Sequence, residues 1–150
     1  MTLPLEGVRV ADFSRVLAGP YCAMLLADLG ADVVKVEGPG GDETRTWGPP
    51  YAGGESAYYL SVNRNKRSIQ LNLKDASDRA LAYRLVEKSD VLLHNFKPGD
   101  DLKLGLEPAR VKKINPTLVY AHISGYGSVG PEANKPGYDL LAQALTGLMS

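Results

Sequence analysis

The sequence has little of several features that define particular classes of protein. One of its 150 residues is cysteine, so no intramolecular disulfide can form, which suits a reducing compartment. Lys plus Arg equals Asp plus Glu, 17 each, and the zero net charge argues against binding of nucleic acid through bulk charge. No apolar run approaches the ~18–20 residues of a membrane span. The opening MTLPLEGVRV lacks the basic start and apolar core of a signal peptide. These absences predict a cytoplasmic protein that binds neither nucleic acid nor membrane.

Catalytic fingerprints are also missing. The sequence contains no metal-ligand spacing of His and Cys, no Cys–His pair and no G-x-S-x-G elbow. It therefore predicts no metal site and no hydrolase triad of the common kinds.

What is present is a strand–turn–helix–strand unit over residues 8–37. The apolar run 8–13 has the length of a strand, and residues 14–19 form a turn. Pro20 suits the first position of a helix, and the following stretch is almost entirely apolar, which predicts a helix buried on all sides.

The second half of this unit completes the pattern. Gly30 suits a left-handed helix end, and the β-branched residues Val33, Val34 and Val36 suit a buried parallel strand. A βαβ unit implies a right-handed crossover in an open sheet, where ligands bind outside the carboxyl ends of the strands. The turn 14–19 and the residues after Glu37 are therefore the first candidates for a site.

The rest of the chain alternates between strand and helix patterns. Asp75 is suited to capping a helix that has Asp78 in its first turn. Segments 38–54 and 125–137 are predicted to be long loops. The other expected elements are an extended segment at 57–62, strands at 68–73, 90–94 and 118–123, and helices at 107–114 and from 138 onward. The pattern predicts one α/β domain with a Rossmann-like, open, mainly parallel sheet and helices on both faces.

A dinucleotide-binding domain is one interpretation of this pattern. Glu37 lies 18 residues after Gly19, near the place where such domains keep their ribose-binding acid. However, the G-x-G-x-x-G turn is absent, and with its single glycine the turn cannot bring the backbone close to a pyrophosphate. NAD binding is therefore disfavoured.

Three segments at predicted strand ends are candidate ligand contacts, and each has a simpler interpretation. Arg15 could equally be a solvated charge. The run 63–68 has three bases in four residues, which is usually a wet edge, although here it leads into an apolar strand. Asn95 and Phe96, followed by a Gly turn, suit a nucleotide, but an ordinary βα turn explains them as well.

Charge alone cannot supply tight binding at such a site. An exposed ion pair contributes only ~0.2–1 kcal/mol, whereas micromolar affinity needs ~8 kcal/mol. A ligand must also be held by a partly apolar groove, which could be lined by Val16, Leu17, Leu71, Leu73 and Phe96.

Four segments, in the same order along nearly the whole chain, resemble the family III CoA-transferases, or CaiB/BaiF family. They are LEGVRVADFSRVLAGPYCAMLLADLGADVVKVEGPGGDETRTWGPP, NRNKRSIQLNL, DVLLHNFKPG and KPGYDLLAQALTG. The family includes formyl-CoA transferase, carnitine CoA-transferase and α-methylacyl-CoA racemase. Its members are usually much longer, so residues 1–150 resemble the N-terminal part of the CoA-binding large domain.

This resemblance implies a set of binding residues. The CoA-binding positions are Arg15, Val16, Ala18, Leu71, Lys74, Asn95, Phe96, Lys97 and Lys103. Positions near the acyl or carboxylate substrate are Trp47, Tyr58 and Tyr138. Gly38 departs from members that have arginine after the strand-end acid, which puts one adenine-side contact in doubt. The implied partners are an acyl-CoA, a carboxylic acid acceptor and a second chain in an interlocked homodimer, with CoA as a substrate and no further cofactor.

The resemblance also implies the chemistry. In the family an aspartate attacks the acyl-CoA thioester, and CoA then passes through an enzyme-bound thioester to the acceptor. That aspartate follows the KPGYD helix at some distance, beyond Ser150, so no catalytic residue is expected in this chain and residues 1–150 alone are expected to be inactive. Asp139 aligns beside the substrate-loop tyrosine and is expected to cap a helix, while Asp42 has no partner evident in the sequence. The alternatives are an α-methylacyl-CoA racemase, which would carry a histidine within 136–139, and a non-catalytic CoA- or nucleotide-binding fragment.

Overall fold

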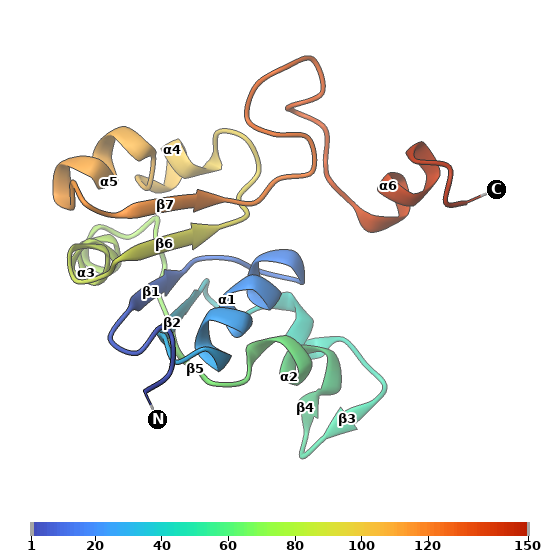
Figure 1. Ribbon diagram of the computed structural model, residues 1–150, viewed down its shortest axis with the longest axis horizontal. Helices are drawn as coiled ribbons and strands as arrows, with labels where there is room; N and C mark the ends of the chain where they lie inside the picture. The colour runs from blue at the N-terminus through green and yellow to red at the C-terminus, as the bar shows by residue number, and fades with distance from the viewer. Residues whose placement is uncertain (1, 150) are drawn as a thin grey trace.

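The computed structural model describes residues 2–149, and its core is a five-stranded sheet (Figure 1). All neighbouring strands pair in parallel, in the order β5-β2-β1-β6-β7. The strands are β1 (Arg9–Asp12), β2 (Asp32–Glu37), β5 (Lys66–Gln70), β6 (Val91–His94) and β7 (Val119–His122). The order reverses between β1 and β6, so their carboxyl ends form the topological switch point where open α/β sheets bind ligands. The predicted α/β class and parallel sheet are confirmed.

Helices cover both faces of this sheet, as predicted (Figure 1). On one face lie α1 (Ala18–Asp28) and α2 (Ala57–Asn63), which contact each other. On the other lie α3 (Ala76–Glu87) and α5 (Pro108–Ile114), which also contact each other. The short helix α4 (Asp100–Leu104), which the sequence pattern did not predict, precedes α5.

Alternating strand residues divide the core into two clusters. Val10 and Val33 pack with Ala23 and Ala27 of α1. Their neighbours on the opposite face of the strands form the larger cluster with α3 and α5: Ala11, Phe13, Val36, Leu71, Ala82, Val86, Leu92, Leu106, Val111 and Leu118. This alternation is the period of two that an extended chain imposes on a sheet buried on both faces.

Helix α1 differs from its sequence prediction in two ways. It begins at Ala18, two residues before Pro20. It is also not buried on all sides, because Tyr21, Leu25 and Leu29 are between 43% and 50% exposed. These residues are four apart and lie along one side of the helix, so the apolar sequence did not distinguish its buried side from its exposed one.

The predicted loop 38–54 is more ordered than its composition indicates. It contains the 3₁₀ helix η1 (Glu43–Thr46) and strand β3 (Tyr51–Ala52), which forms a hairpin with β4 (Glu55–Ser56) directly after the loop. The extended segment predicted at 57–62 is wrong, since this stretch is helix α2. Ser56 caps the helix by accepting a hydrogen bond from the Tyr59 amide at 3.3 Å. A local cap therefore overrides the strand preference of the aromatic and β-branched residues.

The other elements agree more closely with prediction. Asp75 caps α3 by accepting from the amides of Ser77 and Asp78. Strand β5 lies at the sheet edge and begins two residues earlier than predicted. None of the helices within residues 2–149 is long and apolar enough to cross a membrane.

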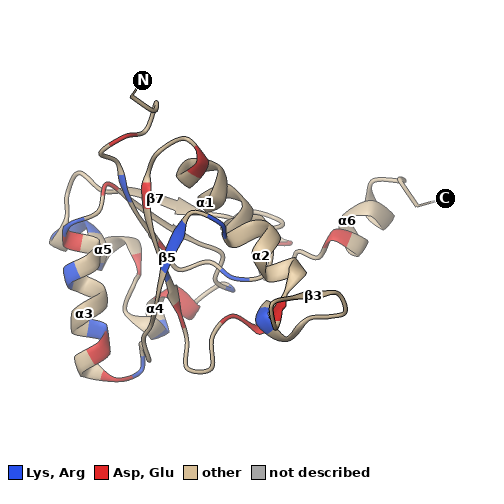
Figure 2. Cartoon of the chain, turned by 90° about the horizontal axis from the view of Figure 1, so that it is seen from below, with Lys and Arg blue, Asp and Glu red and all other residues tan. Residues whose placement is uncertain are grey.

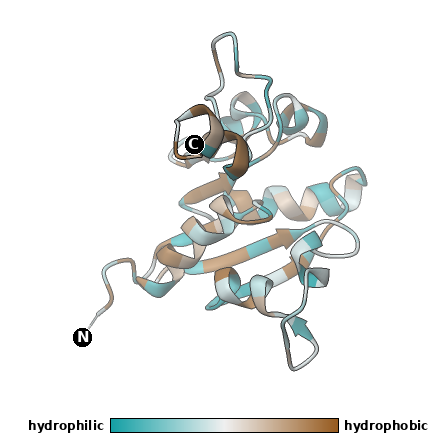
Figure 3. Cartoon of the chain, turned by 90° about the vertical axis from the view of Figure 1, so that its right-hand side faces the viewer, coloured by the Kyte–Doolittle hydropathy of each residue, from teal (hydrophilic) through white to brown (hydrophobic). Residues whose placement is uncertain are grey.

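The last helix, α6 (Asp139–Leu145), lies away from the sheet at the end of a long connection (Figure 1). Figure 3 shows it as a hydrophobic element on the outside of the molecule. Leu140, Leu145 and Leu148 are each more than 60% exposed. Asp139 does not cap the helix as predicted, because its carboxylate accepts from the Gln143 side chain at 2.6 Å instead.

Candidate functional site

A cavity of about 470 Å³ opens at the carboxyl ends of the strands. Its walls are the loops after β1, β2, β5 and β6, so four segments far apart in the sequence meet there. The lining residues are Phe13, Ser14, Arg15, Lys35, Val36, Glu37, Gly38, Pro39, Gly40, Gly41, Asp42, Glu43, Leu71, Asn72, Leu73, Lys74, Phe96, Lys97, Asp100 and Leu104. The volume lies in the range of small-molecule sites, and the position is the one that the parallel sheet predicts.

Five of the nine predicted CoA-binding residues line this cavity: Arg15, Leu71, Lys74, Phe96 and Lys97. Leu71 is buried in the larger core cluster, and Phe96 and Leu73 pack against it. The cavity thus has apolar walls where the core reaches the carboxyl ends of the strands. Leu17, which the sequence placed in the groove, is 44% exposed and does not line it.

Asn95 joins the two loops of the switch point. Its side chain accepts a hydrogen bond from the Arg15 amide at 3.0 Å and donates one to the Arg15 carbonyl at 2.7 Å. Asn95 itself does not line the cavity. Its position predicts that it acts by fixing the backbone of Arg15.

The turn between β1 and α1 is tightly constrained. Gly19 packs against Ser14, because a Cβ atom at Gly19 would lie 2.2 Å from the Ser14 Cβ. Val16 adopts φ 69°, a left-handed conformation that costs of order 1–3 kcal/mol for a residue other than glycine. Strain of this kind concentrates at functional sites. Val16 therefore remains a candidate CoA contact, as does Ala18 at the start of α1. Neither residue lines the cavity.

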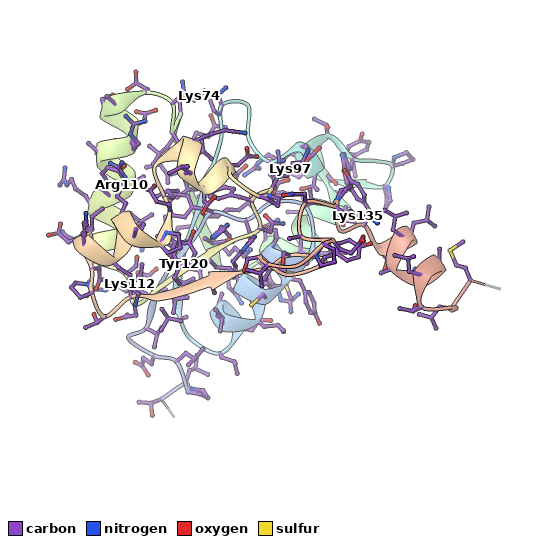
Figure 4. The ribbon with its side chains drawn as sticks, turned by 90° about the horizontal axis from the view of Figure 1, so that it is seen from above. Lys74, Lys97, Arg110, Lys112, Tyr120 and Lys135 are labelled. Carbon is purple, nitrogen blue, oxygen red and sulfur yellow. The ribbon has the colours of Figure 1, made fainter. Side chains whose placement is uncertain are left out.

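Three cations at the rim of the cavity, Arg15, Lys74 and Lys97, are exposed. Among residues 2–149 none of the three has a carboxylate within ion-pair distance, and we call them the rim cations. Figure 4 shows Lys74 and Lys97 away from Lys112 of α5. Lys103, also predicted to bind CoA, instead pairs with Asp100 at 2.9 Å.

The basic run 63–68 has a different role. Arg64 pairs with Asp28 at 2.6 Å, and Arg67 makes a bidentate pair with Asp32. The Lys66 side chain is 2% exposed, and its ammonium lies 3.0 Å from a buried oxygen of Asp12. All three bases are therefore neutralised within the chain, and in Figure 2 β5 stands out in blue at its sheet edge. The segment is therefore neither a free cationic patch nor a simple solvent-exposed edge of the sheet.

Buried charges extend from Lys66 across the sheet on the α1 side. The Lys35 ammonium lies 2.9 Å from Asp42 and donates to the Ser14 carbonyl at 2.9 Å. Glu37 pairs with Arg45 at 2.7 Å. We call these six residues the inner charge layer: Asp12, Lys35, Glu37, Asp42, Arg45 and Lys66.

Glu37 is the most heavily hydrogen-bonded member of this layer. It accepts from Arg45, Tyr59, Ser68 and the Asp42 amide. Burial raises the pKa of Glu37, but these donors outweigh it and lower the pKa to about 2. The pKa of Tyr59 is raised by burial and by the Glu37 charge. Glu37 is therefore a structural anion here.

Sequence reasoning missed this layer, although one signal was available. Lys35 interrupts the β-branched run Val33–Val36, and a lysine inside a fully buried strand requires a partner. That partner is Asp42, which the sequence left without one. Burial raises the pKa of Asp42, but hydrogen bonding and charge from Lys35 more than offset this, so its pKa lies below the ordinary value.

A second group that the sequence did not single out surrounds His94, which is 1% exposed. Its ring stacks on His122 with centroids 4.5 Å apart, and its Nδ1 accepts from the Phe96 amide at 3.2 Å. Burial, reinforced by His122, lowers the pKa of His94 to about 4. A neutral histidine therefore supports the loop that carries Phe96 and Lys97.

The predicted substrate residues lie in two places. Trp47 and Tyr58 are together, with ring centroids 5.1 Å apart. Tyr138 is 62% exposed at the start of α6, and none of the three lines the cavity. Within residues 2–149 no cluster of three or more His, Cys, Asp or Glu residues is arranged to hold a metal ion.

Comparison with known proteins decides the family. The sequence model of the family described as "CoA-transferase family III" matches residues 5–150. The chain belongs to this family. It is 51% identical over 147 residues to the human (Homo sapiens) succinyl-CoA:glutarate CoA-transferase, covering 97% of this chain and 34% of that protein. It is 50% identical over 147 residues to acetyl-CoA:oxalate CoA-transferase of Acetobacter aceti, and the match covers 97% of this chain and 38% of that protein. The chain thus spans about a third of the length of these relatives.

Solved structures agree with this assignment. A CAIB/BAIF family protein from Brucella suis superposes with a TM-score of 0.95 at 46% identity, covering 99% of this chain and 40% of that one. A putative β-ketoacyl-ACP reductase superposes with a TM-score of 0.51 at 19% identity, and the match covers 96% of this chain and 65% of that one. The second likeness extends to the fold alone. The family III chain therefore has a Rossmann-like sheet whose turn lacks the glycine fingerprint of dinucleotide-binding domains.

Proposed function

We propose that this segment forms the CoA-binding part of an enzyme that transfers CoA between carboxylic acids. The observation that carries the proposal is the cavity at the switch point, where apolar walls lie beside three rim cations that have no carboxylate partner among residues 2–149. CoA has phosphates at one end and adenine and pantetheine groups that need an apolar surface. Arg15, Lys74 and Lys97 would face the phosphates, and Leu71 and Phe96 the uncharged groups.

The relatives support transfer as the reaction. The two relatives described above are named as CoA-transferases, one acting on succinyl-CoA and glutarate and the other on acetyl-CoA and oxalate. In the proposed reaction an aspartate carboxylate attacks the acyl-CoA carbonyl and releases CoA thiolate, leaving a mixed anhydride. The thiolate attacks the aspartyl carbonyl and releases the donor acid, which leaves an enzyme–CoA thioester. The acceptor carboxylate attacks that thioester and releases the thiolate, which then attacks the acyl carbonyl of the new anhydride and regenerates the aspartate.

The two aspartates nearest the predicted substrate residues are poor candidates for this nucleophile. Asp42 is 5% exposed and paired with Lys35, so attack would require breaking a buried ion pair. Asp139 lies on α6, where its carboxylate is bound to Gln143. We therefore propose that the catalytic aspartate is neither of them. Trp47, Tyr58 and Tyr138 remain the proposed contacts of the acyl or acceptor group.

A racemase is the second candidate within the family, and one observation disfavours it. Segment 136–139 reads Pro-Gly-Tyr-Asp and contains no histidine to move an α-proton. A phenol is a much poorer acid–base catalyst at pH 7 than an imidazole. A non-catalytic CoA-binding protein is the third candidate, and activity separates it from the other two.

The test uses the intact protein that carries this segment. It is incubated with succinyl-CoA or acetyl-CoA and a panel of dicarboxylic acids, and formation of the new CoA ester is measured. In parallel, a 2-methylacyl-CoA is incubated in deuterated water. We expect CoA exchange with trapping of an enzyme-bound thioester by hydroxylamine. Deuterium exchange of the α-proton at the rate of turnover would instead establish a racemase, and CoA binding without either reaction would support the third candidate.

A further inference from the structure

We propose that Lys35 is a positioning residue that holds two walls of the cavity at a fixed separation. The proposal rests on the proposed function for its ligand, CoA, but its structural part can be tested without a ligand. The ammonium of Lys35 donates a hydrogen bond to the Ser14 carbonyl, in the turn before Arg15, and at the same time forms an ion pair with Asp42, in the loop after β2. Both walls line the cavity.

The contacts of Lys35 are enclosed and specific. The side chains of Lys35 and Asp42 are each 1% exposed, so water cannot replace either contact. The other oxygen of Asp42 accepts from the Thr44 amide at 3.0 Å and its hydroxyl at 2.8 Å, which starts helix η1. The Lys35 ammonium therefore helps to fix where η1 begins, together with Glu37, which accepts from the Asp42 amide and from Arg45. Trp47, whose ring lies tilted against that of Tyr58, directly follows η1.

The Ser14 side of the link is equally constrained. The Ser14 amide donates to Asp12 at 2.9 Å, and Asp12 is held by Lys66. Because Ser14 precedes Arg15 and the strained Val16, a shift of the Ser14 carbonyl would move the backbone that presents the Arg15 guanidinium. Lys35 thus connects a rim cation on one wall with the predicted substrate residues on the other.

Lys66 provides a matched control. It is also a buried lysine paired with an aspartate, but its ammonium contacts Asp12, Asn63 and the Pro20 carbonyl. None of these belongs to the loop after β2. Removing either ammonium leaves a buried carboxylate without its partner, so both variants lose stability. Only the loss of Lys35 disconnects the two walls.

The first experiment is hydrogen exchange, measured by mass spectrometry on the intact protein without ligand. For Lys35→Met we expect faster exchange of the amides at 42–47 together with those at 14–16. For Lys66→Met we expect residues 42–47 to keep their protection. Unchanged protection of 42–47 in Lys35→Met, or equal loss in both variants, would overturn the positioning role.

The second experiment separates positioning from stability. Adding Asp42→Asn to Lys35→Met removes the stranded carboxylate while an Asn oxygen can still accept from Thr44, so the double variant should regain much of the lost thermal stability. We expect its Kd for CoA to stay about tenfold or more above wild type, because the walls remain disconnected. Recovery of CoA affinity together with stability would show a merely structural role. If wild type itself does not bind CoA, the proposed function fails, and the exchange result still decides the positioning role.

Discussion

The basic run 63–68 and the rim cations have the same chemistry but opposite surroundings. In the run, Arg64, Lys66 and Arg67 each face a carboxylate of this chain. At the rim, none of Arg15, Lys74 and Lys97 does within residues 2–149. The run is the denser cluster in the sequence, yet its charges are used to hold strands and helices together. A cation is available to an anionic ligand only when the fold leaves it unpaired.

The largest expected effect is on Lys66, the buried member of the run. Replacement by Met leaves Asp12 as an uncompensated buried charge, which typically costs about 3–5 kcal/mol. We therefore expect a large fall in thermal stability, measured by calorimetry on the intact protein. The folded variant should still bind CoA within about threefold of wild type. A small stability change with a large loss of CoA affinity would place Lys66 with the rim cations and break the comparison.

The interior carboxylate Glu37 should make stability depend on acid. Its folded pKa of about 2 lies below the ordinary 4.5, so its contribution is complete above pH 4.5 and is lost as the pH falls toward 2. The difference between these two pKa values corresponds to about 3 kcal/mol in the free energy of unfolding. The difference in melting temperature between wild type and Glu37→Gln should therefore narrow steadily as the pH falls from about 4.5 toward 2. A constant difference in melting temperature between the two proteins across this pH range would contradict the assignment.

At the rim, single replacements of Arg15, Lys74 or Lys97 by Gln should have the opposite signature. Each exposed charge contributes ~0.2–1 kcal/mol, so each variant should weaken CoA binding about 1.4- to 5-fold with no change in melting temperature. The salt dependence of the affinity should fall as well. Lys113→Gln, on α5, is the matched control. The comparison fails if the control weakens binding as much as the rim variants do.

The smallest effect belongs to Arg67, the exposed base of the run. Its pair with Asp32 is on the surface, so Arg67→Gln should cost less than about 1 kcal/mol and leave the Kd for CoA unchanged. Titration calorimetry beside Arg15→Gln makes the contrast direct. A loss of affinity equal to that of Arg15→Gln would return the basic run to the binding site.

How far the sequence predicts this molecule depends on the range of the interactions. The first βαβ unit and the capping of α3 by Asp75 follow from local patterns, and both were predicted. Helix α2 was not, because the strand preferences of Tyr58, Tyr59 and Val62 are outweighed by the Ser56 cap and by the bond from Tyr59 to Glu37.

The residues of the site also divide into those that the sequence predicted and those that depend on contacts between distant parts of the chain. Arg15, Leu71, Lys74, Phe96 and Lys97 were predicted from family resemblance, and the fold brings them to one cavity. The inner charge layer was missed, because its pairs join residues between 7 and 54 positions apart. A pattern of apolar positions shows that Lys35 is exceptional but cannot identify Asp42 as its partner.

The most direct test of this account is a titration of the intact wild-type protein with CoA, NAD and ATP, followed by CoA titrations of Asn95→Ala and Lys74→Gln. The cavity, whose rim cations have no carboxylate partner in the described part of the chain, predicts micromolar CoA binding, tighter than that of NAD or ATP, and weaker CoA binding by both variants. NAD binding tighter than CoA, or variants that bind CoA as well as wild type does, would contradict it.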